Sequence, residues 1–179
     1  MGVPSYFAYL IRNHKEMLIK LVDFKKQINN LYFDSNSIIY DALRILSKDY
    51  EKFKNDDTFE NELIKMVCLN IENYIYEINP NKKVLIAFDG VAPTAKLEQQ
   101  RTRRHKSILE KKIMNHIDGE IPSWNKTAIT PGTLFMDKLN TQVNKYFYGQ
   151  EKKYGVEKII FSGSDKPGEG EHKLFHYIF

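Results

Sequence analysis

The sequence predicts an α/β fold in which a mostly parallel central sheet is flanked by helices. Three short stretches have the length of strands: the apolar runs 31–33 and 84–88, and residues 157–161, which end in Ile-Ile-Phe. Segments with the helical spacing of apolar residues separate these runs. Strands that alternate with helices along a chain are typical of a parallel sheet covered by helices.

Helices are expected wherever apolar residues recur at helical spacing. In chain order they cover residues 3–11, 37–46, 57–78, about 94–116, about 133–148, and a last segment that begins near residue 169. The longest opens with Asp57 and Thr58 and ends at Asn79 and Pro80, which are ordinary start and stop signals. The run 84–88 is apolar throughout and closes on Asp-Gly, as expected of a strand buried on both faces.

Length and composition fit one folded domain, expected to span residues 1–179. The chain has 42% hydrophobic and 28% charged residues, which excludes wholesale disorder. No apolar stretch approaches the roughly 18 residues of a membrane span. The single cysteine, Cys68, lies among apolar residues and is expected to be a core thiol. One cysteine and no signal peptide favour a reducing compartment, with the cytoplasm expected and the nucleus as the alternative.

The excess positive charge is concentrated in one segment. The formal net charge is +4. Residues 94–112 contain seven Lys or Arg and two Glu, which gives +5, so the rest of the chain sums to −1. Such a cluster is the electrostatic footprint of a polyanionic partner. A solvated helix face, or a chance likeness to a nuclear-localisation signal, is the alternative left open.

Acidic residues lie where three expected strands end. Asp34 follows the first strand, Asp89 follows the second, and Glu169 and Glu171 lie in the glycine-flanked turn after the third. Functional sites of open parallel sheets gather at this edge. Carboxylates about 4 Å apart repel by about 4 kcal/mol at an effective dielectric of 20, so a converging set requires a cation. Oxygen ligands favour Mg²⁺ or Mn²⁺. Taken singly, each acid has an alternative as a helix cap or turn former.

Glu169 and Glu171 pose a geometric difficulty. Two positions apart on a regular helix, their side chains would point about 200° apart. Both can reach one site only if the backbone there is irregular, which Gly168 and Gly170 would allow.

The basic segment has a narrow polar face. At about 100° per residue, Lys96, Gln100, Arg103 and Arg104 fall within one sector of a helix. Arginine suits bidentate contact with phosphate, and the start of a helix favours anions. An exposed salt-bridging face is the alternative, although this face holds no acid.

Several stretches resemble the N-terminal region of 5′→3′ exoribonucleases of the Xrn family. They are Met1-Gly2-Val3-Pro4-Ser5-Tyr6-Phe7, Leu31-Tyr32-Phe33-Asp34-Ser35-Asn36-Ser37-Ile38-Ile39, Phe88-Asp89-Gly90-Val91-Ala92-Pro93-Thr94-Ala95-Lys96 with Gln99-Gln100-Arg101-Thr102-Arg103-Arg104, Ile129-Thr130-Pro131-Gly132-Thr133, and Phe161-Ser162-Gly163 with Pro167-Gly168-Glu169-Gly170-Glu171-His172-Lys173. The matches come in order and cover nearly the whole chain.

The resemblance implies a PIN-like, FEN-type nuclease fold and a Mg²⁺-dependent enzyme, with two ions and Mn²⁺ as a possible substitute. It implies that the metal ligands and catalytic residues are Asp34, Asp89, Glu169 and Glu171. It implies that the pocket for a 5′-monophosphate consists of Lys96, Gln100, Arg103 and Arg104. The implied substrate is single-stranded RNA with a 5′-monophosphate, degraded processively to nucleoside 5′-monophosphates in RNA decay or processing. Gly2 would lie near the substrate entry.

Two departures from the family pattern qualify these expectations. Tyr40 stands where the family usually has a histidine that stacks on the 5′ base; tyrosine can also stack, and simple packing under the helix is the alternative. The family's active site also uses further aspartates downstream, so the domain is expected to be incomplete at its C-terminal end, and activity of this stretch alone is left open. A non-catalytic module that binds RNA 5′ ends and a structure-specific flap endonuclease are the alternative functions.

Overall fold

The chain is organised around a three-stranded parallel sheet. A computed structural model describes residues 5–24, 26–118 and 123–178. The sheet has the order β1-β2-β3, and its strands are β1 (Asn30–Asp34), β2 (Lys83–Ala87) and β3 (Lys158–Ser162). Every strand boundary lies within one residue of the predicted run. The predicted α/β fold with a parallel sheet is confirmed.

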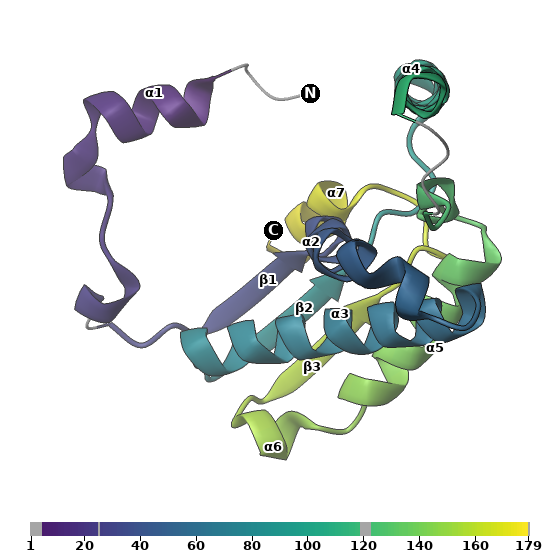
Figure 1. Cartoon of the computed structure of the whole chain (residues 1–179). Coiled ribbons are helices and arrows are strands. Elements are labelled where there is room, and N and C mark those ends of the chain that lie inside the picture. The colour runs from purple at the N-terminus through teal and green to yellow at the C-terminus, as the bar shows by residue number, and fades with distance from the viewer. Residues whose placement is uncertain (1–4, 25, 119–122, 179) are drawn as a thin grey trace.

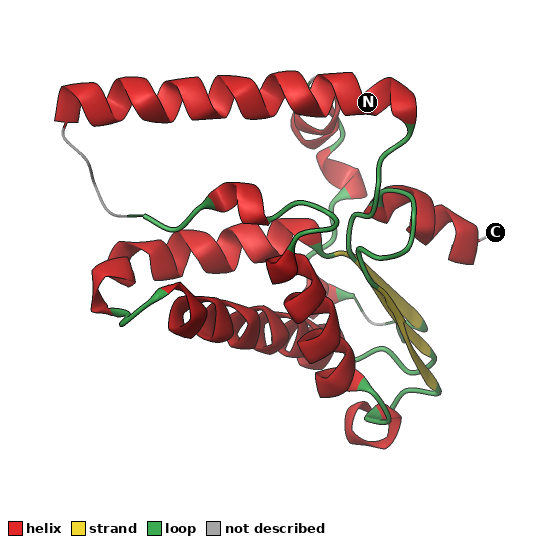
Figure 2. Ribbon diagram, turned by 90° about the vertical axis from the view of Figure 1, so that its right-hand side faces the viewer, coloured by secondary structure: helices red, strands yellow, loops and turns green. Residues whose placement is uncertain are grey.

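Helices cover both faces of this sheet. In chain order they are α1 (Tyr6–Asn13), α2 (Asn36–Leu46), α3 (Asp56–Ile78), α4 (Thr94–Asp118), α5 (Leu134–Phe147), α6 (Glu151–Tyr154) and α7 (Gly170–Ile178). Short 3₁₀ turns occur at Lys15–Met17, Leu21–Asp23, Ser47–Lys52 and Lys126–Ala128. In Figures 1 and 2, α2, α3 and α5 lie on one face of the sheet and α7 lies on the other, against β1 and β2. The short helix α6 was not predicted.

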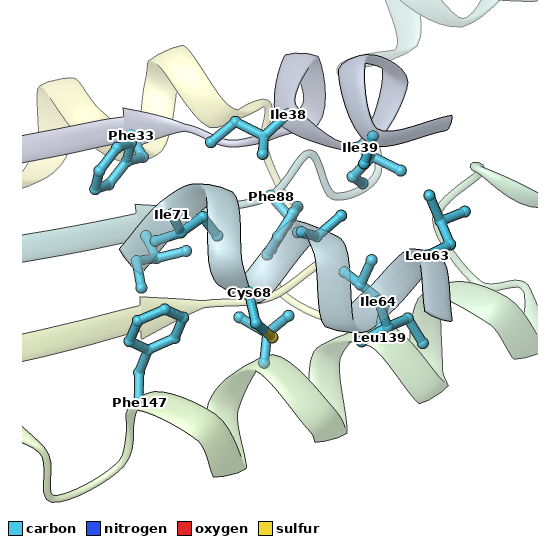
Figure 3. Close-up of a cluster of buried hydrophobic side chains, with 14 of the residues drawn as sticks. Phe33, Ile38, Ile39, Leu63, Ile64, Cys68, Ile71, Phe88, Leu139 and Phe147 are labelled. Atoms are coloured by element: carbon cyan, nitrogen blue, oxygen red, sulfur yellow. The ribbon is translucent and has the colours of Figure 1, made fainter. Parts of the chain in front are cut away.

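The main core lies between the sheet and the layer formed by α2, α3 and α5. Figure 3 shows side chains of this cluster, with Phe33 and Phe88 on the sheet side, Ile71 on α3 and Leu139 on α5. Cys68 is only 2% exposed within this cluster. Burial raises the pKa of the Cys68 thiol to about 12, so the thiolate is scarce at neutral pH and the predicted core role is confirmed.

The long helix α3 is fixed at both ends. Its first turn is closed by a capping box, in which the Asn55 side chain accepts from the Thr58 N–H (2.9 Å) and the Thr58 hydroxyl accepts from the Asn55 N–H (3.3 Å). Its last turn ends at Asn79, whose φ of +49° is left-handed. The cap places the start of the helix one residue before the predicted Asp57.

Two helices lie largely away from this body. The long basic helix α4 extends along one side of the molecule in Figure 2, and α1 stands apart in Figure 1. No residue of α1 is buried, and Phe7 is 70% exposed. Gly2 lies outside the described residues. Within the described part of the chain, no helix has both the length and the apolar character that crossing a membrane requires.

Candidate active site

The register of the sheet brings the predicted acids to one edge. Asp34 pairs with Ala87, and Ala87 pairs with Ser162, so the three strands end side by side. Asp89 lies two residues beyond the end of β2. Because all three strands run the same way, their carboxyl ends form one rim on which the following loops meet.

Backbone hydrogen bonds join the loop after β2 to the loop before α7. The N–H of Gly90 donates to the carbonyl of Gly168 (2.8 Å), and the N–H of Gly168 donates to the carbonyl of Val91 (3.0 Å). Gly168 has a φ of +97°, a backbone conformation that would be strained in a residue with a side chain. These bonds set Asp89 beside the turn that carries Glu169.

The same turn resolves the geometric difficulty of the two glutamates. Glu169 immediately precedes α7, and Glu171 is the second residue of that helix. The pair therefore does not share a regular helix, and both side chains line one cavity. The irregular backbone expected around Gly168 and Gly170 is present.

The four acids share a cavity, which we call the acidic cavity, with Lys96 and Arg103 of α4. Its volume is about 420 Å³. It is lined by Asp34, Asp89, Lys96, Gln99, Gln100, Arg103, Glu169 and Glu171. All four predicted carboxylates and three of the four predicted phosphate ligands therefore converge.

Arg104 and Tyr40 are placed differently from that set. Arg104 lines an adjoining cavity of about 540 Å³, which shares Gln100 with the acidic cavity. Tyr40, one turn into α2, is 46% exposed and does not line the acidic cavity. Its exposure contradicts the alternative in which Tyr40 is packed under the helix, whereas base stacking remains a prediction.

The carboxylate of Asp89 is held on both of its oxygens. The N–H of Gly170 donates to Oδ1 (2.7 Å), and Nδ2 of Asn36 donates to Oδ2 (2.9 Å). The Asn36 side chain also accepts from the N–H of Asp89 (3.0 Å) through its own Oδ1. A carboxylate has about four lone-pair directions, so two remain for another ligand.

Charge repulsion within the acidic cavity is visible in the pKa of Asp34. Desolvation by the surrounding protein and then the nearby Asp89 carboxylate raise the pKa of Asp34 above its ordinary value. Glu171 and Glu169 add to this increase, while the backbone N–H of Asn36 opposes it. A divalent cation among these carboxylates would relieve the repulsion.

In this structure the positive charge nearest the acids comes from α4. Lys96 Nζ lies 2.6 Å from Oε2 of Glu169, a side chain that is itself only 7% exposed. The hydrogen bond with Glu169 raises the pKa of Lys96, and Glu171 and Asp89 contribute to the same change. The basic face of α4 holds no acid of its own, as the sequence indicated, and Lys96 pairs instead with Glu169 in the turn before α7.

A buried lysine fixes the rim on which the acids stand. Lys173 of α7 is 7% exposed, and its Nζ donates to the carbonyls of Phe88 and Gly163, both at 2.7 Å. These carbonyls follow the ends of β2 and β3. The contact ties α7, which carries Glu171, to both strand ends.

The donor set fits a hard divalent cation. It offers carboxylate oxygens from three strand ends, and Lys96 already pairs with one of them, on Glu169. Glu169, Glu171 and His172 each place one ligand atom within 4.8 Å of the others. Oxygen-rich sites of this kind suit Mg²⁺ or Mn²⁺.

Three residues of the site were missed in the sequence. Gln99 lines the acidic cavity; at about −60° from Lys96 on the helical wheel it borders the predicted face, a signal that could have included it. Asn36 and His172 contact the acids but lie within stretches where only the carboxylates pointed to a site. The contact of Asn36 with Asp89 depends on the tertiary structure, whereas the contact of His172 with Glu169 is local, three residues apart.

A parallel α/β sheet with carboxylates at the ends of its strands, beside a basic helix, is the arrangement that a PIN-like nuclease domain would have. The family model described as "XRN 5'-3' exonuclease N-terminus" matches residues 1–179, and the chain belongs to this family.

Curated relatives agree with this assignment. The chain is 35% identical over 190 residues to the 5'-3' exoribonuclease 1 of Saccharomyces cerevisiae, covering 99% of this chain and 12% of that protein. It is 30% identical to the 5'-3' exoribonuclease 2 of Kluyveromyces lactis, covering 99% of this chain and 21% of the relative. Identity to the 5'-3' exoribonuclease 1 of Schizosaccharomyces pombe is also 30%, over 99% of this chain and 14% of the relative. The chain thus spans between about an eighth and a fifth of these relatives.

Proposed function

We propose that the chain is the N-terminal part of the nuclease domain of a Mg²⁺-dependent 5′→3′ exoribonuclease that acts on RNA with a 5′-monophosphate. The observation that carries the proposal is the acidic cavity, where four carboxylates face Lys96, Gln100 and Arg103 of α4. Membership of the Xrn family and the names of the relatives support it.

The carboxylates and the residues of α4 would have different roles in the acidic cavity. The carboxylates of Asp34, Asp89, Glu169 and Glu171 would hold the divalent cations. When bound, such ions supply Lewis-acid stabilisation of the phosphodiester and lower the pKa of a water molecule. Hydrolysis then forms a bond from the water oxygen to phosphorus and breaks the bond to the 3′ oxygen of the leaving nucleotide.

Residues of α4 would position the RNA end. Arg103 and Lys96 offer charged N–H donors to a terminal phosphate, and Gln100 offers an amide between them. To bind phosphate, the Lys96 ammonium would turn away from Glu169 as cations take over the neutralisation of the acids. Anchoring the 5′-phosphate fixes which phosphodiester lies over the carboxylates, so that each cycle releases one nucleoside 5′-monophosphate. Arg104 lines the adjoining cavity and would approach the phosphate from the side where the two cavities share Gln100.

The test compares Arg103→Ala with Arg101→Ala on labelled RNA carrying either a 5′-phosphate or a 5′-hydroxyl. Arg101→Ala is a matched control, since it removes the same charge from the same helix at a residue that does not line the acidic cavity. Losing a charge-assisted contact of roughly 1.5–3 kcal/mol should reduce the preference for 5′-phosphate about 10- to 100-fold in Arg103→Ala. The ratio should stay unchanged in Arg101→Ala.

The substrates separate the alternative functions. This chain, and any longer natural protein that contains it, are given 5′-phosphorylated RNA, single-stranded DNA and a DNA flap with Mg²⁺. Release of mononucleotides from RNA supports the proposal. Binding of RNA ends without products would indicate a non-catalytic module, and cutting at the flap junction would indicate a flap endonuclease.

A further inference from the structure

Asn36 lies at the start of α2 and reaches a residue 53 positions away. Its amide makes two hydrogen bonds with Asp89: Nδ2 donates to the carboxylate at 2.9 Å, and Oδ1 accepts from the backbone N–H at 3.0 Å. One planar side chain therefore forms hydrogen bonds with both the backbone and the carboxylate of Asp89. Rotation of the Asp89 carboxylate would break the first bond.

Local helix capping does not explain this arrangement. Asn is common near helix starts because its side chain can accept from the helix's own N–H groups. Here Ser35 holds the cap position without a side-chain capping bond, and the amide of Asn36 is engaged with Asp89 instead. The Asn36 side chain therefore holds Asp89, just beyond the end of β2, and does not cap its own helix.

The orientation that results leaves Asp89 able to bind a cation. Gly170 donates to one oxygen of Asp89 and Asn36 donates to the other. Both donors are uncharged, so the carboxylate keeps its full negative charge and its remaining lone pairs. The two donors hold the Asp89 carboxylate in place although it lies near enough to Asp34 to raise the pKa of that carboxyl.

Resting on the proposed function, we infer that Asn36 is a positioning residue, which holds the Asp89 carboxylate in the orientation that binds the divalent cation. Partners that orient metal ligands typically change metal affinity 10- to 100-fold when they are removed. A role confined to stability would change unfolding and leave metal affinity unaltered.

Asn140 provides a matched control. Its amide makes the same two-point contact with Ser164, donating to the hydroxyl at 2.9 Å and accepting from the N–H at 3.0 Å. Neither Asn140 nor Ser164 lines the acidic cavity. Asn140→Leu therefore removes an equivalent pair of hydrogen bonds without removing a contact to a carboxylate of the cavity.

The experiment measures binding of Mn²⁺ by isothermal titration, and metal-free thermal unfolding, for the native chain and for Asn36→Leu, Asn36→Ala, Asn140→Leu and Asp89→Asn. We expect Mn²⁺ to bind 10- to 100-fold more weakly to both Asn36 variants and to be unaffected in Asn140→Leu. Asp89→Asn should lose binding at least as strongly as the Asn36 variants.

Each contrary result has a distinct meaning. Native affinity in either folded Asn36 variant, an equal loss in Asn140→Leu, or failure of both Asn36 variants to fold would overturn the positioning role alone. Absence of Mn²⁺ binding by the native chain, or native affinity in Asp89→Asn, would overturn the proposed metal site and the positioning role with it.

Discussion

At the scale of single residues, Gly170 shows how closely the carboxylates are packed. Its N–H donates to Asp89, and a Cβ at this position would collide with Oδ1 of Asp34 and lie 2.9 Å from its Cγ. Real Cβ atoms essentially never come this close to another heavy atom. The φ of Gly170 is not left-handed, so the backbone itself would accept alanine, but the Asp34 side chain would have to move to make room for the Cβ.

The consequence is a substitution that should affect metal binding more than stability. In Gly170→Ala the Asp34 carboxylate must turn away, so we expect Mn²⁺ affinity to fall by roughly tenfold or more while the helix itself is undisturbed. Gly132→Ala is the control: it strains a φ of +87° but meets no atom within 4 Å. Titration with Mn²⁺ should show native affinity in Gly132→Ala, and native affinity in Gly170→Ala would contradict the packing described.

At the scale of elements, Glu72 joins α3 to α5 and α6. From α3 it accepts hydrogen bonds from Tyr146 of α5 (2.9 Å) and from Tyr154 (2.7 Å) and Lys153 (2.6 Å) of α6. Burial raises the pKa of Glu72, but the three donors outweigh it and hold the pKa below its ordinary value of 4.5. The ionised carboxylate is the form that stabilises the fold.

Stability should therefore depend on pH through this residue. The contribution of Glu72 is complete above pH 4.5 and is lost as the pH falls through the lower pKa of the folded state. We expect Glu72→Gln to lower the free energy of unfolding by about 1–3 kcal/mol at pH 7. The difference should narrow as the pH falls below 4.5.

Urea unfolding of the native chain and the variant between pH 7 and pH 3 measures this difference. Glu77→Gln, at an exposed position of the same helix, should match the native chain throughout. If the difference in free energy of unfolding between the native chain and Glu72→Gln stayed constant down to pH 3, the stabilising role of the ionised Glu72 carboxylate would be contradicted.

The elements and the acids could be predicted to different extents. Local signals located the strands to within one residue, because each apolar run is bounded by polar residues or glycine. The meeting of Asp34, Asp89, Glu169 and Glu171 at one rim followed from the parallel arrangement, which alternating elements predict. The helix α6 is only four residues long and carries too little periodicity to be recognised.

Contacts between distant segments were beyond local signals. The hydrogen bond from Asn36 to Asp89 and the ion pair between Lys96 and Glu169 depend on how strand ends and α4 sit against each other. The helical wheel grouped Arg104 with Arg103, but the loop that carries Thr127 and Thr130 approaches α4 on the side of Arg104 and divides the face between two cavities. A wheel describes one helix and contains no information about its neighbours.

At the scale of the whole molecule, the sheet collects the acids while α4 brings the basic residues over them. The carboxylates come from positions 34 to 171 of the sequence and share one rim because three parallel strands end there. Helix α4 follows directly from the loop after β2. Its first turns line the acidic cavity at that rim, and its remaining length extends along one side of the molecule (Figure 2). The proposed divalent cation would therefore bind where the end of the sheet meets α4.

Anomalous diffraction from crystals of the chain soaked in Mn²⁺ tests the proposed cation site most directly. The account predicts a peak within ligand distance of oxygens from Asp34, Asp89 and the turn that carries Glu169 and Glu171. Its loss in Asp89→Asn crystals would confirm the ligand set. Crystals of the native chain that bind Mn²⁺ only at other surfaces, or that leave the acidic cavity without a peak at saturating metal, would contradict it.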